Sequence, residues 1–278
     1  MVINHLIDST EVDKLRRILE HLYENKIGFK EGALFDAVGL DDGSESRFPQ
    51  ITDPRKLAPE LLESAYFGSA EALAKQILGP TAKLRNDIMF MKPARVGSVT
   101  AWHQDEAFAN PDYQHDQISI WLALTQAQSE NSCMSFVPGS HRLPVLMHQP
   151  VGGDPRMHAL ECIGDFDAAS AVECPLQPGG CTIHDHRTLH YAGPNNSDRP
   201  RLAYVLTFDT KLVLRDKPLD YPWRKDRNLT ARATREREWR RQTGMLKFAW
   251  RNRDELVDRG IAKMSALKDQ AARILRGK

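Results

Sequence analysis

The spacing of hydrophobic residues predicts helices in the first part of the chain. A helix that begins at Ser9 or Thr10, with Asp13 as a capping-box acid, carries apolar residues three or four positions apart: Val12, Leu15, Ile18, Leu19 and Leu22. A second helical stretch covers about residues 57–78, is interrupted around residues 67–69, and ends at Gly79-Pro80. We expect both helical stretches to pack against the outside of a sheet.

From about Lys83 the pattern changes to short apolar segments that are rich in β-branched and aromatic residues. The clearest predicted strands are residues 88–91, 118–124, 134–137, 181–183 and 202–208. This pattern is typical of an antiparallel barrel or sandwich, so the sequence predicts a mainly β fold with flanking helices. A long excursion from Gly152 to about Ser170 separates two of the strands. We expect it to face the substrate, because loops on rigid scaffolds often carry selectivity.

The last part of the chain differs from the rest in charge. Residues 221–260 contain 12 Lys and Arg against 6 Asp and Glu, a local balance of +6. Aromatic residues lie among these basic residues, and a helix is expected from about Asp254 to Leu275; the aromatics are Trp223, Trp239, Phe248 and Trp250. Arg240 and Arg241 belong either to a solvated helical face or to a contact with an anionic substrate. We predict one domain over residues 1–210, with its β core at about 83–210, and a helical extension over 211–278 that packs on it.

Length, charge and cysteine content restrict the class of protein. The 278 residues suffice for one large domain, and the net charge of +1 gives no overall attraction to nucleic acid or an anionic membrane. No apolar run approaches the roughly 20 residues of a membrane span, and the N-terminus carries no export signal. The cysteines have no zinc-like spacing and are expected to be reduced; they are Cys133, Cys162, Cys174 and Cys181. We therefore expect a cytoplasmic protein without nucleic-acid or membrane partners.

A histidine and an aspartate two residues apart, His103 and Asp105, form the most informative motif. On a β-strand such residues point to the same face of the sheet, so both side chains can reach one metal ion. His190, 85 residues beyond Asp105, can complete a set of two histidines and one carboxylate. This is the ligand set of non-haem Fe(II) oxygenases, and it leaves coordination positions open.

Other histidines compete for the third ligand position. His184 and His186 lie two apart on or beside a predicted strand, so either could present its imidazole to the metal. The alternative for both is a hydrogen-bonded structural role. His141 lies in the stretch Pro138-Gly139-Ser140-His141-Arg142, which we interpret as a turn.

Several separate segments resemble a known enzyme family. They are Met91-Lys92-Pro93, Trp102-His103-Gln104-Asp105, Phe136-Val137-Pro138-Gly139-Ser140-His141, and the His190 stretch that ends in Asp198-Arg199-Pro200-Arg201. In order and spacing, from about residue 85 to 210, they resemble the phytanoyl-CoA dioxygenase family. The resemblance implies a double-stranded β-helix (jelly-roll, cupin-like) barrel that uses Fe(II), 2-oxoglutarate and O₂. It also favours His190 as the third ligand, because the following Gly193-Pro194-Asn195 and the spacing to Arg201 fit.

The resemblance implies further contacts to 2-oxoglutarate. An arginine eleven residues after the distal histidine meets the far carboxylate, and Arg201 occupies that position. Asn86, Gln104 and Trp121 correspond in position to residues that border the cosubstrate, although a strand-end cap, an outward-facing side chain and a core residue are their respective alternatives. Ala192 departs from the pattern, because many relatives carry a serine there. A hydroxyl contact is therefore missing or supplied elsewhere.

The resemblance predicts a dioxygenase that hydroxylates, or otherwise oxidises, an unactivated C–H bond of a small and possibly anionic molecule, with release of succinate and CO₂. Halogenases of this family replace the metal-binding carboxylate with a small residue, so Asp105 argues against halogenation. A non-catalytic binding protein would be expected to lose the triad or the arginine. Lys14-Leu15 and His21-Leu22 also resemble a peroxisomal signal, or else form one face of the first helix.

Overall fold

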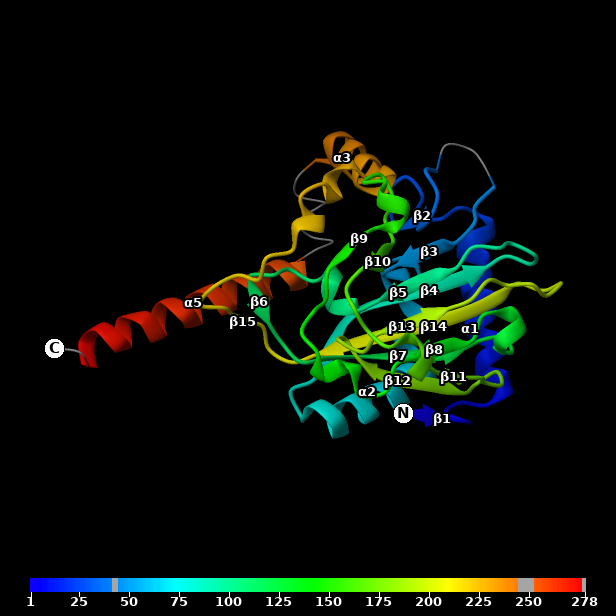
Figure 1. Ribbon diagram of the computed structural model, residues 1–278, viewed down its shortest axis with the longest axis horizontal. Coiled ribbons are helices and arrows are strands. Elements are labelled where there is room, and N and C mark those ends of the chain that lie inside the picture. The colour runs from blue at the N-terminus through cyan, green and yellow to red at the C-terminus, as the bar shows by residue number, and fades with distance from the viewer. Residues whose placement is uncertain (42–44, 245–252, 277–278) are drawn as a thin grey trace.

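A computed structural model describes residues 1–41, 45–244 and 253–276, without the side chains of residues 254, 255 and 269–276. The predicted aromatics Phe248 and Trp250 lie outside the described residues. The helices are α1 (Ser9–Glu24), α2 (Ala65–Leu78), α3 (Ala231–Thr243) and α5 (Arg253–Arg276). The strands of the described residues form two antiparallel sheets and two short strand pairs (Figure 1).

The larger sheet has seven strands and carries α1 and α2 on one face. Its strand order is β1 (Val2–Ile3), β12 (Cys181–Asp185), β7 (Gln117–Ala123), β14 (Arg201–Asp209), β4 (Lys83–Lys92), β3 (Pro49–Thr52) and β2 (Leu34–Asp36). The smaller sheet has the order β11 (Val172–Cys174), β8 (Met134–Phe136), β13 (His190–Ala192) and β5 (Thr100–His103). The two pairs are β9 (His148–Pro150) with β10 (Leu160–Cys162), and β6 (Tyr113–Gln114) with β15 (Val213–Leu214). The predicted mainly β fold of the jelly-roll type is confirmed, although no hydrogen bonds among the described strands join the two sheets into a closed barrel.

Successive side chains of the central strands point alternately into the main core and into the space that contains the site. In β7, Ile118, Ile120 and Leu122 join the main core beneath α1 and α2. The intervening Trp121 and Ala123 pack on the other face, against Met134 and Ala192 of the smaller sheet. Because successive side chains of a strand point to opposite faces, one strand can bury apolar residues under the helices and present others to the space between the sheets.

The helices begin and end at residues that satisfy their free backbone groups. The N-cap of α1 is Asp8, which accepts from Glu11 N at 2.9 Å, so the predicted caps Ser9 and Thr10 are wrong by one or two residues. The predicted interruption at residues 67–69 is also wrong. The break lies at Ser64, whose hydroxyl caps α2, and the helix then continues to Leu78. Leu15 and Leu22 lie in the core. Their burial fits the alternative in which Lys14-Leu15 and His21-Leu22 belong to one face of α1.

The extension after residue 210 has one part that packs on the sheets and one that projects from them. Trp223, only 8% exposed, clusters with Ala107, Leu160 and Tyr221. Its indole Nε1 donates to the Ala107 carbonyl at 2.9 Å. In contrast, α5 extends away from the sheets (Figure 1).

Most of the large apolar side chains described on α5 are exposed, while Ala262 is buried against β6 and the loop after β14. The exposed residues are Leu256, Val257, Ile261, Met264 and Leu267. Among the described helices, none has both the length and the apolar composition that a membrane span requires.

The buried indole of Trp223 should contribute to the stability of the whole domain. We expect Trp223→Ala to lower the free energy of unfolding by about 3–5 kcal/mol, because the substitution leaves a cavity and an unpaired carbonyl at Ala107. Urea unfolding followed by far-UV circular dichroism measures this change. Leu229→Ala is the matched control, since Leu229 lies in the same segment but is 49% exposed. Equal stability of the Trp223 and Leu229 variants would contradict the packing role.

Candidate metal centre and cosubstrate pocket

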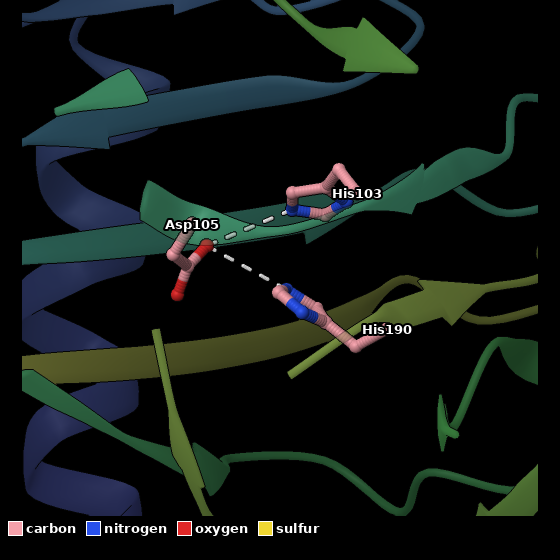
Figure 2. Close-up of side chains that lie close together, drawn as sticks. All are labelled: His103, Asp105 and His190. Carbon is pink, nitrogen blue, oxygen red and sulfur yellow. Dashed lines mark ion pairs between the residues drawn. The ribbon is translucent and has the colours of Figure 1, made fainter. Parts of the chain in front are cut away.

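His103, Asp105 and His190 come together between the two sheets (Figure 2). Their ligand atoms all lie within 4.8 Å of one another. The Asp105 Oδ1 atom is 3.7 Å from His103 Nε2 and 3.6 Å from His190 Nε2. In the smaller sheet, His190 of β13 lies directly opposite His103 of β5. The three residues are therefore positioned to bind one metal ion.

The local backbone places His103 and Asp105 on one side, in a way that differs from the prediction. Only His103 belongs to β5, whereas Asp105 is the first residue of the 3-10 turn η3 (Asp105–Phe108). The intervening Gln104 is extended, with φ −115° and ψ 131°. This conformation continues the alternation of the strand for one more residue, so both ligands still face the same way.

Each histidine of the triad is oriented by a backbone carbonyl. The Nδ1 atom of His103 lies 2.8 Å from the Ala101 carbonyl, and that of His190 lies 2.8 Å from the Thr188 carbonyl. A carbonyl can only accept, so Nδ1 carries the proton and donates it. The lone pair of Nε2 is then directed toward Asp105, which is the tautomer that a metal requires.

Burial and neighbouring groups set the protonation states of the triad. Loss of solvation lowers the pKa of His103 and of His190, so both imidazoles are neutral near pH 7. Burial alone would raise the pKa of the Asp105 carboxyl, but the Coulomb attraction of His190, which acts when that imidazole is protonated, and a hydrogen bond with His184 lower it below its ordinary value. Two neutral imidazoles and one carboxylate are the protonation states of metal ligands.

The carboxylate of Asp105 is also held from the larger sheet. The Ser119 hydroxyl, on β7, donates to Asp105 Oδ2 at 2.9 Å. His184, on β12, has its Nε2 atom 3.6 Å from the same oxygen. Oδ1 thus faces His103 and His190, while Oδ2 faces two residues of the larger sheet. This arrangement fixes the orientation of the carboxylate.

His184 and His186, the other candidates for the third ligand position, have different surroundings. His184 lines the same cavity as the triad, next to Asp105. His186 turns instead toward Glu106, 3.4 Å away, and His115. His141 lies in the 3-10 turn η5 (Ser140–Arg142), away from the cavity lining.

Arg201 and the triad line one cavity of about 1010 Å³. Arg201 begins β14 and is 1% exposed, yet its Nε and Nη1 atoms have no hydrogen-bond partner among the described residues. Its Nη2 atom donates to the Ser132 hydroxyl at 3.3 Å, and its guanidinium carbon lies 5.2 Å from the Trp121 ring. Burial lowers the pKa of Arg201 to about 10, which still leaves it charged near neutral pH. A buried, charged guanidinium with free donors fits a carboxylate.

The remaining residues assigned to the cosubstrate lie in different environments. Asn86 and Trp121 line the cavity. Gln104 is fully buried outside the cavity lining, where its amide donates to the carbonyls of Pro144 and Arg187 and accepts from Leu146 N. The structure therefore does not bring Gln104 to the other site residues.

Ala192 has no side-chain hydroxyl where many relatives carry a serine. Its backbone carbonyl accepts a hydrogen bond from the buried Lys92 Nζ at 2.9 Å. A hydroxyl beside Arg201 comes instead from Ser132.

Several residues of the site carry no sequence signal. Ser119 and Ser132 reach Asp105 and Arg201 only because distant strands pair in a particular register. Phe108 and His158 line the cavity, and the Phe108 ring centroid lies 5.9 Å from that of His103 and 6.1 Å from that of His158. His158 does lie in the excursion that the sequence predicts to face the substrate.

The comparisons with known proteins agree with this geometry. The sequence profile described as "Phytanoyl-CoA dioxygenase (PhyH)" matches residues 1–203. A probable alpha-ketoglutarate-dependent hypophosphite dioxygenase from Stutzerimonas stutzeri is 33% identical over 128 residues, which are 45% of this chain and 44% of that protein. A phytanoyl-CoA dioxygenase domain-containing protein 1 from Danio rerio is 30% identical over 44% of this chain and 43% of its own length. These matches thus span less than half the length of either relative.

Solved structures extend the similarity over most of the chain. EvdO2 from Micromonospora carbonacea var. aurantiaca, complexed with 2-oxoglutarate, is 35% identical with a TM-score of 0.68, over 80% of this chain and 90% of that one. The non-heme alpha ketoglutarate dependent epimerase SnoN from nogalamycin biosynthesis is 26% identical with a TM-score of 0.55, over 77% of this chain and 80% of that one. Because the family profile covers well over half of the sequence and includes both the triad and Arg201, the chain belongs to the phytanoyl-CoA dioxygenase family.

Proposed function

We propose that this protein is an Fe(II)- and 2-oxoglutarate-dependent dioxygenase that hydroxylates an unactivated C–H bond of a small molecule. In the overall reaction one oxygen atom of O₂ enters the product as a hydroxyl group. The other enters succinate, which forms from 2-oxoglutarate with release of CO₂. O₂ is the oxidant of this reaction. Bound Fe(II) would activate O₂, and oxidation of 2-oxoglutarate would supply two of the four electrons that O₂ accepts.

One observation carries the proposal. The metal-binding triad and a buried guanidinium with free donors line the same cavity. A buried cation without an anionic partner is costly, so its presence beside a metal site indicates a bound carboxylate. 2-Oxoglutarate has a carboxylate at each end, so one end can bind the metal while the other pairs with Arg201.

The residues of the chain have distinct roles in this reaction. His103, Asp105 and His190 hold Fe(II) on one side and leave other coordination positions for the cosubstrate and O₂. Arg201 binds the far carboxylate of 2-oxoglutarate, with Trp121 packed on its guanidinium. Asn86 lines the same cavity and is a further donor for the cosubstrate.

The position of Asp105 bears on the reaction type. A carboxylate that faces both histidines occupies the place where a halide would have to bind, so halogenation is disfavoured. The same oxidising centre can support other outcomes, and one similar protein is described as an epimerase. Hydroxylation is the simplest outcome of C–H oxidation, and it is the one we propose.

The triad assignment predicts the effect of single histidine variants on metal binding. We expect one Fe(II) per chain, and we expect His190→Ala to weaken Fe(II) binding and abolish 2-oxoglutarate-dependent succinate formation. Anaerobic Fe(II) titration and a succinate assay measure these quantities. His186→Ala is the matched control, since His186 is equally buried but turned toward Glu106. Full activity of His190→Ala, together with loss in His184→Ala or His186→Ala, would show that the third ligand is misassigned.

The cosubstrate assignment predicts a specific defect in an Arg201 variant. Loss of a charge-assisted contact to a buried carboxylate costs about 2–5 kcal/mol. We therefore expect Arg201→Gln to raise the 2-oxoglutarate concentration needed for half-maximal turnover by roughly 30-fold or more. Fe(II) affinity should stay near that of the wild type, which separates this defect from loss of the metal. An unchanged 2-oxoglutarate requirement in Arg201→Gln would exclude the assignment.

The contact between Ser119 and Asp105 predicts a smaller effect on metal binding. Residues that orient metal ligands typically contribute about 10- to 100-fold to metal affinity or activity. We expect Ser119→Ala to weaken Fe(II) binding within this range, because Asp105 loses its donor at Oδ2. Ser135→Ala, which removes a buried hydroxyl of β8, is the control. If both serine variants bind Fe(II) like the wild type, Ser119 does not position the ligand.

A further inference from the structure

The cavity that contains the metal triad also contains arginines from the segment after the sheets. Arg224 ends the turn η8 (Pro222–Arg224), Arg227 begins η9 (Arg227–Leu229), and Arg232 lies in the first turn of α3. All three line the same cavity as the triad. The composition of the sequence predicts positive charge in this part of the chain, but the hypothesis of a contact with an anionic substrate concerned Arg240 and Arg241. Those two are exposed on α3 and do not line the cavity.

Arg227 and Arg224 are held by uncharged groups. Arg227 Nη1 donates to the His158 carbonyl at 2.6 Å, and its Nη2 atom lies 3.4 Å from His158 Nδ1. Arg224 Nη1 donates to the carbonyls of Phe108 and Ala109. In the described parts of the chain, neither arginine forms an ion pair with a carboxylate. These hydrogen bonds fix both side chains. Among the described residues, no acceptor is bound by Nε of Arg227 or by Nε and Nη2 of Arg224, so these atoms can donate to a ligand.

Other arginines of the same cavity are neutralised by the protein itself. Arg55 pairs with Asp53 and Asp87, and Arg85 pairs with Asp209 and Asp258. Such pairs need no ligand. Arg224 and Arg227 therefore differ from Arg55 and Arg85, because no carboxylate among the described residues forms an ion pair with either of them.

The protonation behaviour of this group is consistent with a local excess of positive charge. Burial and the nearby Arg232 and Arg224 lower the pKa of Arg227 to about 10. Burial, together with Arg227 and Arg232, lowers the pKa of His158 well below its ordinary value, so His158 is neutral near pH 7. Close guanidinium groups repel one another, and a bound anion would relieve that repulsion.

This group of arginines is separated from the metal centre by one aromatic ring. The Phe108 ring centroid lies 5.9 Å from the His103 ring and 5.2 Å from the guanidinium carbon of Arg227. A small molecule that contacts Arg227 can therefore extend over Phe108 toward the metal ligands. The arginines would then bind one end of a substrate whose other end lies beside the metal.

We propose that Arg224 and Arg227, supported by Arg232, bind an anionic group of the substrate, and that the carbon to be oxidised lies beyond Phe108 at the metal. This proposal rests on the proposed function and gives it a substrate class: a small molecule with a terminal carboxylate, phosphonate, phosphate or sulfonate. The second carboxylate of 2-oxoglutarate is bound elsewhere, at Arg201. The arginine group thus adds a second anion site to the same cavity.

Titration calorimetry with small anions tests this site directly. The full-length protein is first loaded with Fe(II) and 2-oxoglutarate without O₂, so that the metal and Arg201 are occupied. Acetate, methylphosphonate and methanesulfonate are then titrated, with dimethyl sulfone as the uncharged counterpart of methanesulfonate. We expect at least one anion to bind and dimethyl sulfone not to bind. The order of the three affinities distinguishes a carboxylate site from a phosphonate or sulfonate site.

The variants locate the binding. We expect Arg224→Gln with Arg227→Gln to weaken anion binding about tenfold or more, while Fe(II) and 2-oxoglutarate still bind as in the wild type. Arg240→Gln with Arg241→Gln removes the same charge from the exposed face of α3 and should leave anion binding unchanged. Arg227→Lys keeps the charge but loses the planar fork, so an intermediate loss is expected. If the double variant does not fold, Arg224→Gln and Arg227→Lys carry the test.

Two results would overturn the anion site. One is a wild-type protein that binds Fe(II) and 2-oxoglutarate but none of the three anions at concentrations of about 10 mM. The other is an equal loss of anion binding in the Arg240 and Arg241 variant, which would indicate a general charge effect. Failure of the wild type to bind Fe(II) or 2-oxoglutarate would instead contradict the proposed function. In that case the anion titrations are carried out on the unloaded Arg201→Gln protein, where the same two results apply.

Discussion

The two-residue period of β7 and β14 is the constraint on which the site depends. One face of these strands must remain apolar because α1 and α2 cover it, and Ile120 and Leu206 lie there. The other face meets the smaller sheet and is free to carry polar groups such as Ser119 and Arg201. A shift of one residue in either strand would exchange the two sets. The fold and the chemistry therefore share the same register, and the apolar core under the helices fixes where the functional side chains point.

Burial has opposite consequences for the two kinds of charged group in this space. Asp105 is surrounded by imidazoles and the Ser119 hydroxyl, so a carboxylate stays ionised in a place that would otherwise favour its neutral form. The Arg201 guanidinium contacts the Ser132 hydroxyl and the Trp121 ring, and two of its nitrogens have no partner among the described residues. The first group is complete within the protein except for a metal. The second is incomplete without an anion, and this difference indicates which parts of the cavity are for ligands.

The sequence predicted the parts of the site that depend on local spacing. His103 and Asp105 could be paired because only one extended residue separates them, and the main strands could be placed from their apolar runs. The same alternation accounts for Gln104, for which the sequence left open an outward-facing side chain: it turns away from the cavity, into a buried network with Pro144 and Arg187. Ser119 and His158 depend on strand register and on a loop path, which have no local signature. The cap of α1 was misplaced because three successive residues, Asp8, Ser9 and Thr10, can all serve as caps.

Residues 1–203, which match the family, and the segment after them supply different functional side chains to one cavity. The triad and Arg201 lie within residues 1–203, which carry the family similarity. Arg224, Arg227 and Arg232 lie beyond it, and Trp223 anchors the start of that segment by its contact with Ala107, in the same turn as Asp105 and Phe108. Arg232 and Arg235 tie α3 to the backbone of the 29–34 segment, so the basic residues also have structural contacts. A segment attached in this way can change its side chains toward the substrate without moving the metal ligands. Shared oxidation chemistry and a variable choice of substrate can therefore coexist on one jelly-roll scaffold.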